Sequence, residues 1–298
     1  MTRRRLVRVL AAFGLALGTG TTPAAADRLD AVLAPSPAQP GDVVLVRVPG
    51  APPDVSGALG ARALRFFPVA GGMAALAGLD LDTEPGPLAW RLTRPGTRGE
   101  PIVVGTGSLV VRPVSFPTQS LTLPPGQVDL DAKTLARVRA EQAELRAALD
   151  AGAGERLWQD VFHPPVEEGR PTGGFGLRRI INGQRRSPHT GFDWAAPRGA
   201  PVLAANAGRV AFVAEHFFPG RLVVLDHGLG LFTLYFHLDE TVVARGEWVA
   251  ARQRLGSVGA TGRSTGPHLH LGVVLDGARV DPMSLLKLPF GAESQRTP

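Results

Sequence analysis

Histidine and aspartate side chains that could bind a metal ion are concentrated in the second half of this 298-residue chain, which has no histidine before His163. His189 and Asp193 lie four residues apart, and the His-x-His pair His268 and His270 follows later in the chain. Imidazole nitrogens and carboxylate oxygens are zinc ligands, and three of them leave the fourth tetrahedral position to water. The pattern therefore predicts one catalytic, rather than structural, zinc site. Thiolate ligands are excluded because the chain contains no cysteine.

The spacing of these residues indicates how they could meet. Two residues apart on a strand, His268 and His270 would point to the same face, so that one binds the metal while the other works beside it. In a fully extended segment, the Cα atoms of His189 and Asp193 would be about 13 Å apart at ~3.3 Å per residue. That is too far for two ligands of one ion. We expect Gly191 to provide the bend that closes this gap.

A zinc ion with an open position favours amide hydrolysis, because it acidifies a bound water molecule and polarises a carbonyl group. The chain has no His-Glu-x-x-His motif, which excludes the helical zincin mechanism. A proton acceptor and an oxyanion stabiliser are still required. His237, and whichever of His268 and His270 does not bind the metal, are the candidates for these roles.

The first 26 residues have the pattern of a secretory signal peptide: a basic start with four arginines, an apolar stretch over residues 9–18, and three alanines before Asp27. The apolar stretch is shorter than the ~20 residues that span a membrane. We therefore predict an exported protein, periplasmic, envelope-associated or secreted, with no stable membrane span in its mature form. Retention by an uncleaved signal is the alternative.

The charge of the mature chain argues against nucleic acid as a partner. Without the four arginines of the signal segment, the formal net charge falls from +6 to +2. A nucleic-acid-binding protein would need clustered Lys and Arg on the mature protein. With 44% hydrophobic and 19% charged residues, the chain has the composition of a globular protein with a core.

The remaining sequence divides into three parts and predicts a mainly β protein. Residues 27–123 contain short β-prone runs separated by Pro- and Gly-rich turns, which predicts a small β-sandwich. Residues 124–160 form a helical linker, with Asp131 as the capping residue and an apolar stripe of Leu135, Val138, Leu145 and Leu149. Residues 161–298 alternate strands with Gly-rich turns, which predicts a mostly antiparallel β domain that carries the metal-type residues at strand ends and turns.

Several other residues of this last domain have simpler expected roles. His227 and His216 are expected to be hydrogen-bond partners at strand ends, not ligands. Tyr235 is expected to share a strand face with His237, so it either lines the cleft or packs on the sheet. Arg178 and Arg179 are expected to be solvated on a β turn, and the alternative is that one of them is positioned toward an acidic peptide.

Three motifs in residues 161–285 resemble the lysostaphin-type, LytM-like zinc metalloendopeptidases, which are peptidoglycan hydrolases. The motifs are Phe175-Gly176 through His189-Thr190-Gly191-Phe192-Asp193, Leu234-Tyr235-Phe236-His237-Leu238, and Gly259-Ala260-Thr261-Gly262-Arg263-Ser264-Thr265-Gly266-Pro267-His268-Leu269-His270. The resemblance implies a C-terminal LytM-like antiparallel β peptidase domain with one Zn²⁺. It also implies that His189, Asp193 and His270 bind the zinc, while His237 and His268 flank the water and the scissile carbonyl.

The implied activity is hydrolysis of stem or cross-bridge peptides of bacterial peptidoglycan. Residues 215–221 depart from the family pattern, because Phe217, Phe218 and Arg221 occupy a turn that is small in many relatives. This departure bears on substrate preference. Two alternatives to a freely active enzyme are kept: a catalytically silent LytM-like regulator of cell-wall amidases or wall-binding module, and a latent enzyme whose β domain or linker covers the cleft.

Overall fold

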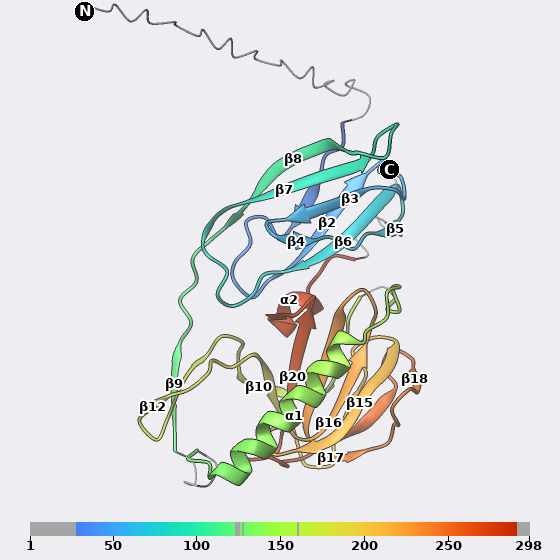
Figure 1. The fold of residues 1–298 in the computed structure, drawn as a ribbon. Helices are drawn as coiled ribbons and strands as arrows, with labels where there is room; N and C mark the ends of the chain where they lie inside the picture. The colour runs from blue at the N-terminus through green and yellow to red at the C-terminus, as the bar shows by residue number, and fades with distance from the viewer. Residues whose placement is uncertain (1–27, 123–125, 127, 160, 291–298) are drawn as a thin grey trace, which may run out of the picture.

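The structure, a computed structural model, describes residues 28–122, 126, 128–159 and 161–290. They form an N-terminal β-sandwich and a larger C-terminal β-sheet domain, with one long helix lying along the latter (Figure 1). The prediction of a mainly β protein with a helical linker is confirmed. The predicted signal peptide lies outside the described residues. Within those residues no helix combines the length and apolar character needed to cross a membrane.

The N-terminal domain is a sandwich of two antiparallel four-stranded sheets. Val44 and Val46 of one sheet pack against Trp90 and Leu92 of the other in a common core. The first sheet has the order β1 (Val32–Ala34), β2 (Val43–Pro49), β6 (Gly72–Gly78), β5 (Phe67–Val69), and the second has the order β4 (Arg62–Ala63), β3 (Ser56–Leu59), β7 (Gly86–Pro95), β8 (Pro101–Val111). The predicted small β-sandwich is therefore present.

The first sheet of the sandwich is buried on both faces. While Val44 and Val46 face the second sheet, Val43, Leu45 and Leu76 belong to the same core cluster as the apolar residues of the C-terminal domain. This explains why β2 reads as an almost continuous apolar run instead of alternating, since a strand covered on both sides has no solvent-facing positions. The two domains thus share one hydrophobic core.

The C-terminal domain is built on one large antiparallel sheet. Its main path has the order β10 (Arg170–Gly173), β13 (Gly191–Ala195), β20 (His268–Leu275), β17 (Leu231–Thr241), β16 (Gly220–Asp226), β15 (Gly208–His216), β18 (Trp248–Val249). Three further strands join it: β14 (Pro201–Leu203), β19 (Arg254–Val258) and β21 (Ala278–Val280). The short helix α2 (Pro282–Leu286) follows at the junction of the two domains (Figure 1).

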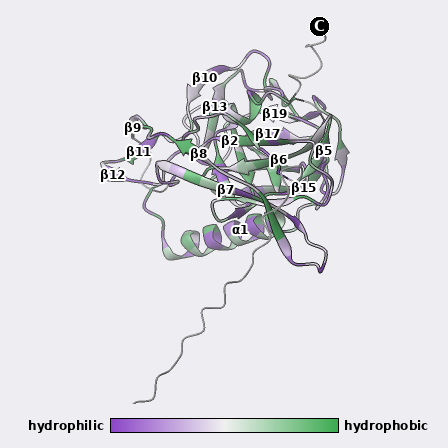
Figure 2. Cartoon of the chain, turned by 90° about the horizontal axis from the view of Figure 1, so that it is seen from above, coloured by the Kyte–Doolittle hydropathy of each residue, from purple (hydrophilic) through white to green (hydrophobic). Residues whose placement is uncertain are grey.

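Helix α1 (Ala132–Asp150) covers the outer face of this sheet. Asp131 caps it as predicted, because its Oδ1 accepts a hydrogen bond of 2.7 Å from the Thr134 backbone N–H. Leu145 and Leu149 pack on apolar residues of β16, β17 and β20, whereas Leu135 is exposed, so the predicted stripe is wrong at its N-terminal end. Figure 2 shows polar and apolar residues alternating along the helix, as expected when only one side is covered.

Strand β9 (Thr118–Leu121), which precedes α1, joins the C-terminal domain. It pairs in parallel with β11 (Arg178–Ile181), and β11 pairs in turn with β12 (Gln184–Arg185). This small three-stranded sheet lies beside β10 and β13. It places Gln119 and Leu121 next to the residues of the candidate site.

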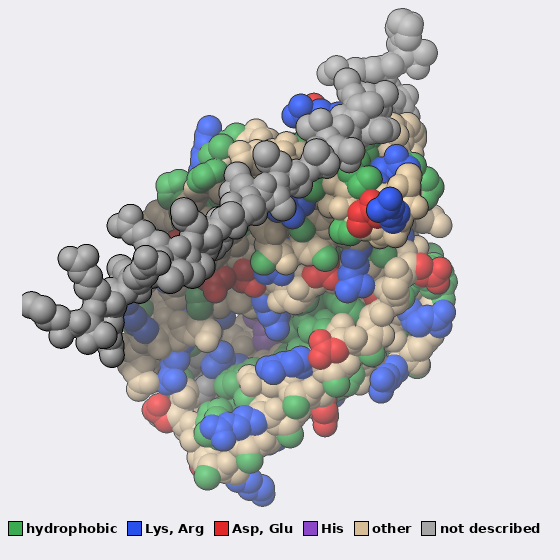
Figure 3. Space-filling view, turned by 45° about the horizontal axis from the view of Figure 1, so that its top comes forward, with side chains coloured by type: hydrophobic (Ala, Val, Ile, Leu, Met, Phe, Trp, Pro, Cys, Tyr) green, Lys and Arg blue, Asp and Glu red, His purple; other side chains and the backbone are tan. Residues whose placement is uncertain are grey.

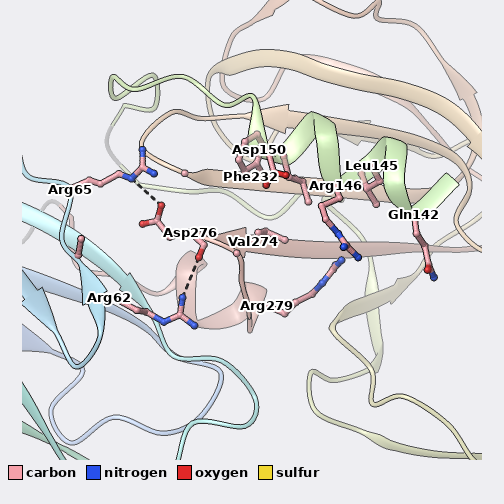
Figure 4. A pocket seen from close by; sticks show the side chains of 14 residues that line it. Arg62, Arg65, Gln142, Leu145, Arg146, Asp150, Phe232, Val274, Asp276 and Arg279 are labelled. Carbon is pink, nitrogen blue, oxygen red and sulfur yellow. Dashed lines mark hydrogen bonds and ion pairs between the residues drawn. The ribbon is translucent and has the colours of Figure 1, made fainter. Parts of the chain in front are cut away.

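A cavity of about 890 Å³ lies between the two domains, bordered by the β3–β4 hairpin region, α1 and the turn between β20 and β21 (Figure 4). Asp276 links the domains across it. Its carboxylate pairs with Arg65 at 3.0 Å and its backbone carbonyl accepts a hydrogen bond of 3.2 Å from Arg62. The interface therefore combines a shared apolar core with polar contacts at its edge.

Candidate active site

Three side chains that sequence analysis singled out converge at the centre of the C-terminal sheet. Asp193 on β13 lies opposite His270 on β20, and the Asp193 Oδ1 to His270 Nδ1 distance is 2.8 Å. His189 precedes β13, and its Nε2 is 2.9 Å from His270 Nδ1 and 3.1 Å from Asp193 Oδ1. The pairing of β13 with β20 thus holds Asp193 beside His270, and the residues that lead into β13 place His189 next to both.

This donor set fits a zinc ion. Donors at ~2.0–2.1 Å from a tetrahedral ion are about 3.3 Å from one another. The three distances found here are shorter by only a few tenths of an ångström. The donor types, two imidazoles and one carboxylate, are those of an open zinc site.

A hydrogen bond to the backbone fixes the His189 ring. Its Nδ1 is 2.8 Å from the Gly174 carbonyl oxygen, and since a carbonyl can only accept, Nδ1 carries the proton. The Nε2 lone pair therefore points at Asp193 and His270 and is available to a metal. A ligand histidine usually has this kind of outer partner, which sets its tautomer and ring orientation.

The charge states of the group are suited to metal binding. Burial opposes ionisation of Asp193, but the adjacent His189 and His270 rings outweigh it and hold the Asp193 pKa below its usual range. Burial lowers the pKa of His270 to about 4 despite the neighbouring carboxylate. At neutral pH the group therefore presents an ionised carboxylate beside a neutral His270, which is the protonation state that ligation requires.

His237 and His268 lie beside the three donors with one free nitrogen each. His237 Nδ1 donates to the Thr261 carbonyl at 2.8 Å, and His268 Nδ1 donates to the Gly266 carbonyl at 2.9 Å. Their ring centroids are 4.7 Å apart. Burial, together with the nearby His270 and His268, lowers the pKa of His237 to about 3, so its free Nε2 is unprotonated at neutral pH.

Residues 187–282, which contain all five of these side chains, match the model of peptidase family M23. The catalytic domain of lysostaphin from Staphylococcus simulans is 31% identical; the match covers 40% of this chain and 93% of that domain, with a TM-score of 0.37. The chain belongs to peptidase family M23.

Two further relatives extend the comparison. The peptidoglycan DD-endopeptidase ShyB of Vibrio cholerae is 38% identical over 135 residues, which are 44% of this chain but 32% of ShyB, so the chain spans about a third of the length of that relative. A solved structure from Pseudomonas aeruginosa, assigned to peptidase M23, is 29% identical, covers 83% of this chain and 94% of its own, and has a TM-score of 0.63. Its coverage includes the N-terminal region as well as the M23 domain.

Gly191 of the M23 domain has a different role from the predicted one. It is the first residue of β13 and is not among the glycines with a left-handed backbone, so it is part of an extended strand and does not form the predicted bend. A Cβ at this position would lie 2.5 Å from His270 Nε2 and 2.4 Å from the Leu271 carbonyl oxygen. Glycine is needed here because the His270 ring lies directly against the backbone.

His237 owes its position to a break in strand β17. It has a left-handed backbone, with φ 64°, and its N–H donates to the Pro219 carbonyl at 2.8 Å. The strand alternation therefore stops before His237. Tyr235, two residues earlier, faces the core, where its hydroxyl accepts the Ala205 N–H at 2.8 Å. The packing role for Tyr235 is confirmed, and the sequence-based expectation that the two residues share a face is wrong.

The expectation that Arg179 is solvated is also wrong. Arg179 on β11 points inward, its side chain is 23% exposed, and its Nη2 is 3.6 Å from Asp193 Oδ2. With Arg263 it lines a cavity of about 340 Å³ that also contains Asp193, His237, His268 and His270. Figure 3 shows histidine side chains at the bottom of a hollow with Lys and Arg side chains around it. Arg178 is exposed, as expected.

The other histidines do not reach the site. His227 is fully buried, with its Nδ1 donating to the Ala207 carbonyl and its Nε2 bonded to Thr233 Oγ1, both at 2.8 Å. His216 is buried under α1, 3.4 Å from Glu144. His227 therefore has the hydrogen-bonding role that the sequence suggested, whereas His216 Nε2 has no hydrogen-bond partner among the described residues, so that role is not found for His216.

Proposed function

We propose that this chain is an exported zinc-dependent endopeptidase that hydrolyses peptide cross-links of bacterial peptidoglycan. The proposal rests on one observation: the side chains of His189, Asp193 and His270 converge within bonding distance of one ion, with two further histidines beside them. Its domain division is a signal peptide (1–26), a β-sandwich (27–123), a helical linker (124–160) and a peptidase domain (161–298).

In this proposal His189 Nε2, Asp193 Oδ1 and His270 Nδ1 hold the zinc ion. Zinc bound there would acidify a water molecule and polarise a peptide carbonyl. The Thr261 and Gly266 backbone carbonyls accept from the Nδ1 atoms of His237 and His268, so the neutral form of each ring has its lone pair on Nε2. One then accepts a proton from water, and the other, once protonated, stabilises the developing oxyanion or donates to the leaving amine.

The substrate assignment is supported by relatives. ShyB carries the name of a peptidoglycan DD-endopeptidase, and the region that resembles it is the M23 domain. The silent-regulator hypothesis has weaker support, because it requires loss of metal ligands and all five residues are retained.

The test combines metal content with product analysis on the chain that begins at Asp27. We expect one zinc per chain and release of peptides from purified sacculi, with the cleaved bond identified by mass spectrometry. His270→Ala is expected to lose both properties. His163→Ala is the matched control, because His163 lies outside the site. A wild-type chain that binds no metal and releases no peptide would contradict the proposal.

A further inference from the structure

One wall of the catalytic cavity carries positive charge without matching acidic groups. Arg179 and Arg263 line it, and Asp193 is the single carboxylate among the described residues that do so. Asp193 Oδ1 is already bonded to His270 and close to His189, and its Oδ2 faces Arg179. The cavity therefore contains a guanidinium group, that of Arg263, whose charge the surrounding side chains do not balance.

The environment of Arg263 makes this imbalance costly. The guanidinium lies 4.0 Å above the ring of Phe218, and none of the ion pairs found among the described residues involves it. Burial, followed by the positive charges of Arg179 and Arg186, lowers the pKa of Arg263. Arg186 has its own partner in Asp129 at 3.5 Å, but Arg263 has only an aromatic face. A half-buried cation of this kind is stabilised most by a carboxylate, which can accept two parallel hydrogen bonds from guanidinium.

The aromatic residues that distinguish this chain from the family pattern lie next to Arg263 and not in the lining of the cavity. Phe217 and Phe218 pack edge to face at 5.0 Å, and the Phe218 ring supports the flat side of the Arg263 guanidinium. The backbone N–H of Arg263 also donates to the Phe218 carbonyl at 2.9 Å, which fixes the chain at this position. The ring contact orients the guanidinium through its flat side, so its N–H groups at the edge stay available to a ligand.

We propose that Arg263 binds a carboxylate of the substrate and thereby selects peptides that carry a negative charge close to the scissile bond. This inference rests on the proposed function and specifies its substrate class. A compact cavity of 340 Å³ is about 7 Å across, or roughly two extended residues at ~3.3–3.6 Å each. The bound carboxylate therefore belongs to the residue at the cleaved bond or to its neighbour. Arg179 strengthens the positive field and positions Asp193.

Two sources can supply this carboxylate: an acidic side chain within the cross-linked peptide, or the free α-carboxylate at the end of a peptide. Four synthetic peptides separate them, all built on one cross-linked peptide sequence of the sacculus. The side-chain group and the C-terminal group are each present as carboxylate or as carboxamide. We expect wild type to cleave the preferred carboxylate form with a kcat/KM roughly 10- to 100-fold above its amide, the factor that a charge-assisted hydrogen bond supplies.

The Arg263 variants then assign the selectivity. Arg263→Gln should bring the carboxylate-to-amide ratio of kcat/KM close to 1, mainly by raising KM for the carboxylate peptides. Arg263→Lys should retain part of it, because the charge remains but the paired hydrogen bonds are lost. Arg185→Gln is the matched control, since Arg185 is exposed on β12 and does not line the cavity. Equal loss of activity toward carboxylate and amide peptides would indicate a structural role for Arg263 and overturn the inference.

A binding measurement separates failure of this inference from failure of the proposed function. The same four peptides are titrated by calorimetry into the full chain and into Arg263→Gln. If no peptide and no sacculus is cleaved, the proposed function fails, but a carboxylate preference that disappears in Arg263→Gln still supports the subsite. Equal affinity of the wild-type chain for carboxylate and amide peptides overturns the inference about Arg263, whether or not the peptides are cleaved.

Discussion

Replacing Gly191 by alanine tests whether close packing against the backbone positions His270. The added Cβ would lie 2.5 Å from His270 Nε2 and Cε1, whereas ordinary van der Waals contact begins near 3.4 Å, so the ring has to move by nearly 1 Å. Alanine itself is compatible with the extended backbone at this position. The clash therefore acts on the His270 ring and on the Leu271 carbonyl, not on the conformation of residue 191.

The expected magnitude follows from these contacts. Displacing a ligand by disturbing its surroundings typically lowers metal affinity by roughly 10- to 100-fold. Overpacking is expected to destabilise the metal-free protein by about 1–3 kcal/mol. Zinc affinity is measured by competition with a chromophoric chelator, and stability by urea unfolding in the presence of excess chelator.

The control is Gly154→Ala, because a Cβ on Gly154 meets no atom within 4 Å and its backbone is not left-handed. We expect this variant to match wild type in both measurements. If Gly191→Ala also matches wild type in zinc affinity and in unfolding midpoint, His270 is not held by contact with the β13 backbone, and the reasoning is refuted.

Three further predictions concern the core and the domain interface. Tyr235→Phe leaves the buried Ala205 N–H without its acceptor and should lower the free energy of unfolding by about 1–3 kcal/mol, measured with urea; an unchanged midpoint would contradict this. Burial lowers the pKa of His227 from 6.5 to about 4, so the unfolded chain takes up this proton first, and stability should fall by up to about 3 kcal/mol as the pH drops between those values. A urea series across this pH range should show a shallower slope for His227→Gln, and an identical slope would count against the assignment. Asp276→Asn removes the ion pair with Arg65, and asparagine tolerates the left-handed backbone, φ 45°, as aspartate does. The free energy of unfolding, measured by thermal unfolding, should therefore fall by only about 0.2–1 kcal/mol.

The parts of the fold that the sequence predicted depend on local patterns. Strand runs, the Asp131 cap and the same-face spacing of His268 and His270 are encoded within a few residues, and the structure has all of them. The three proposed metal donors were found because few other residue types bind zinc and histidine is rare in this chain. Their roles as ligands stay a prediction that the metal analysis tests.

The features that the sequence did not predict depend on contacts between distant segments. The inward orientation of Arg179 follows from the pairing of β9 with β11, two strands far apart in the chain. The left-handed backbone of His237 depends on the Pro219 carbonyl of a neighbouring turn, and histidine has no local preference strong enough to reveal it. A glycine that is required by a neighbouring ring, as Gly191 is, looks the same in sequence as one required by a turn.

The shared core changes how the latency hypothesis has to be tested. Gly78 of β6 packs so closely on β21 that a Cβ there would lie 3.0 Å from Val280 and 3.1 Å from Ala278. The sandwich therefore supports the far end of β20, the strand that begins at His268 and His270. Removing the sandwich would expose Trp158 and other residues of the shared core. A shortened chain that begins near Trp158 would therefore differ from the full chain in stability as well as in access to the cleft. Substitutions in β9, whose Gln119 lines the cavity, address access in the intact protein. Because they leave the shared core in place, a change in cleavage rate can be attributed to the opening of the cleft.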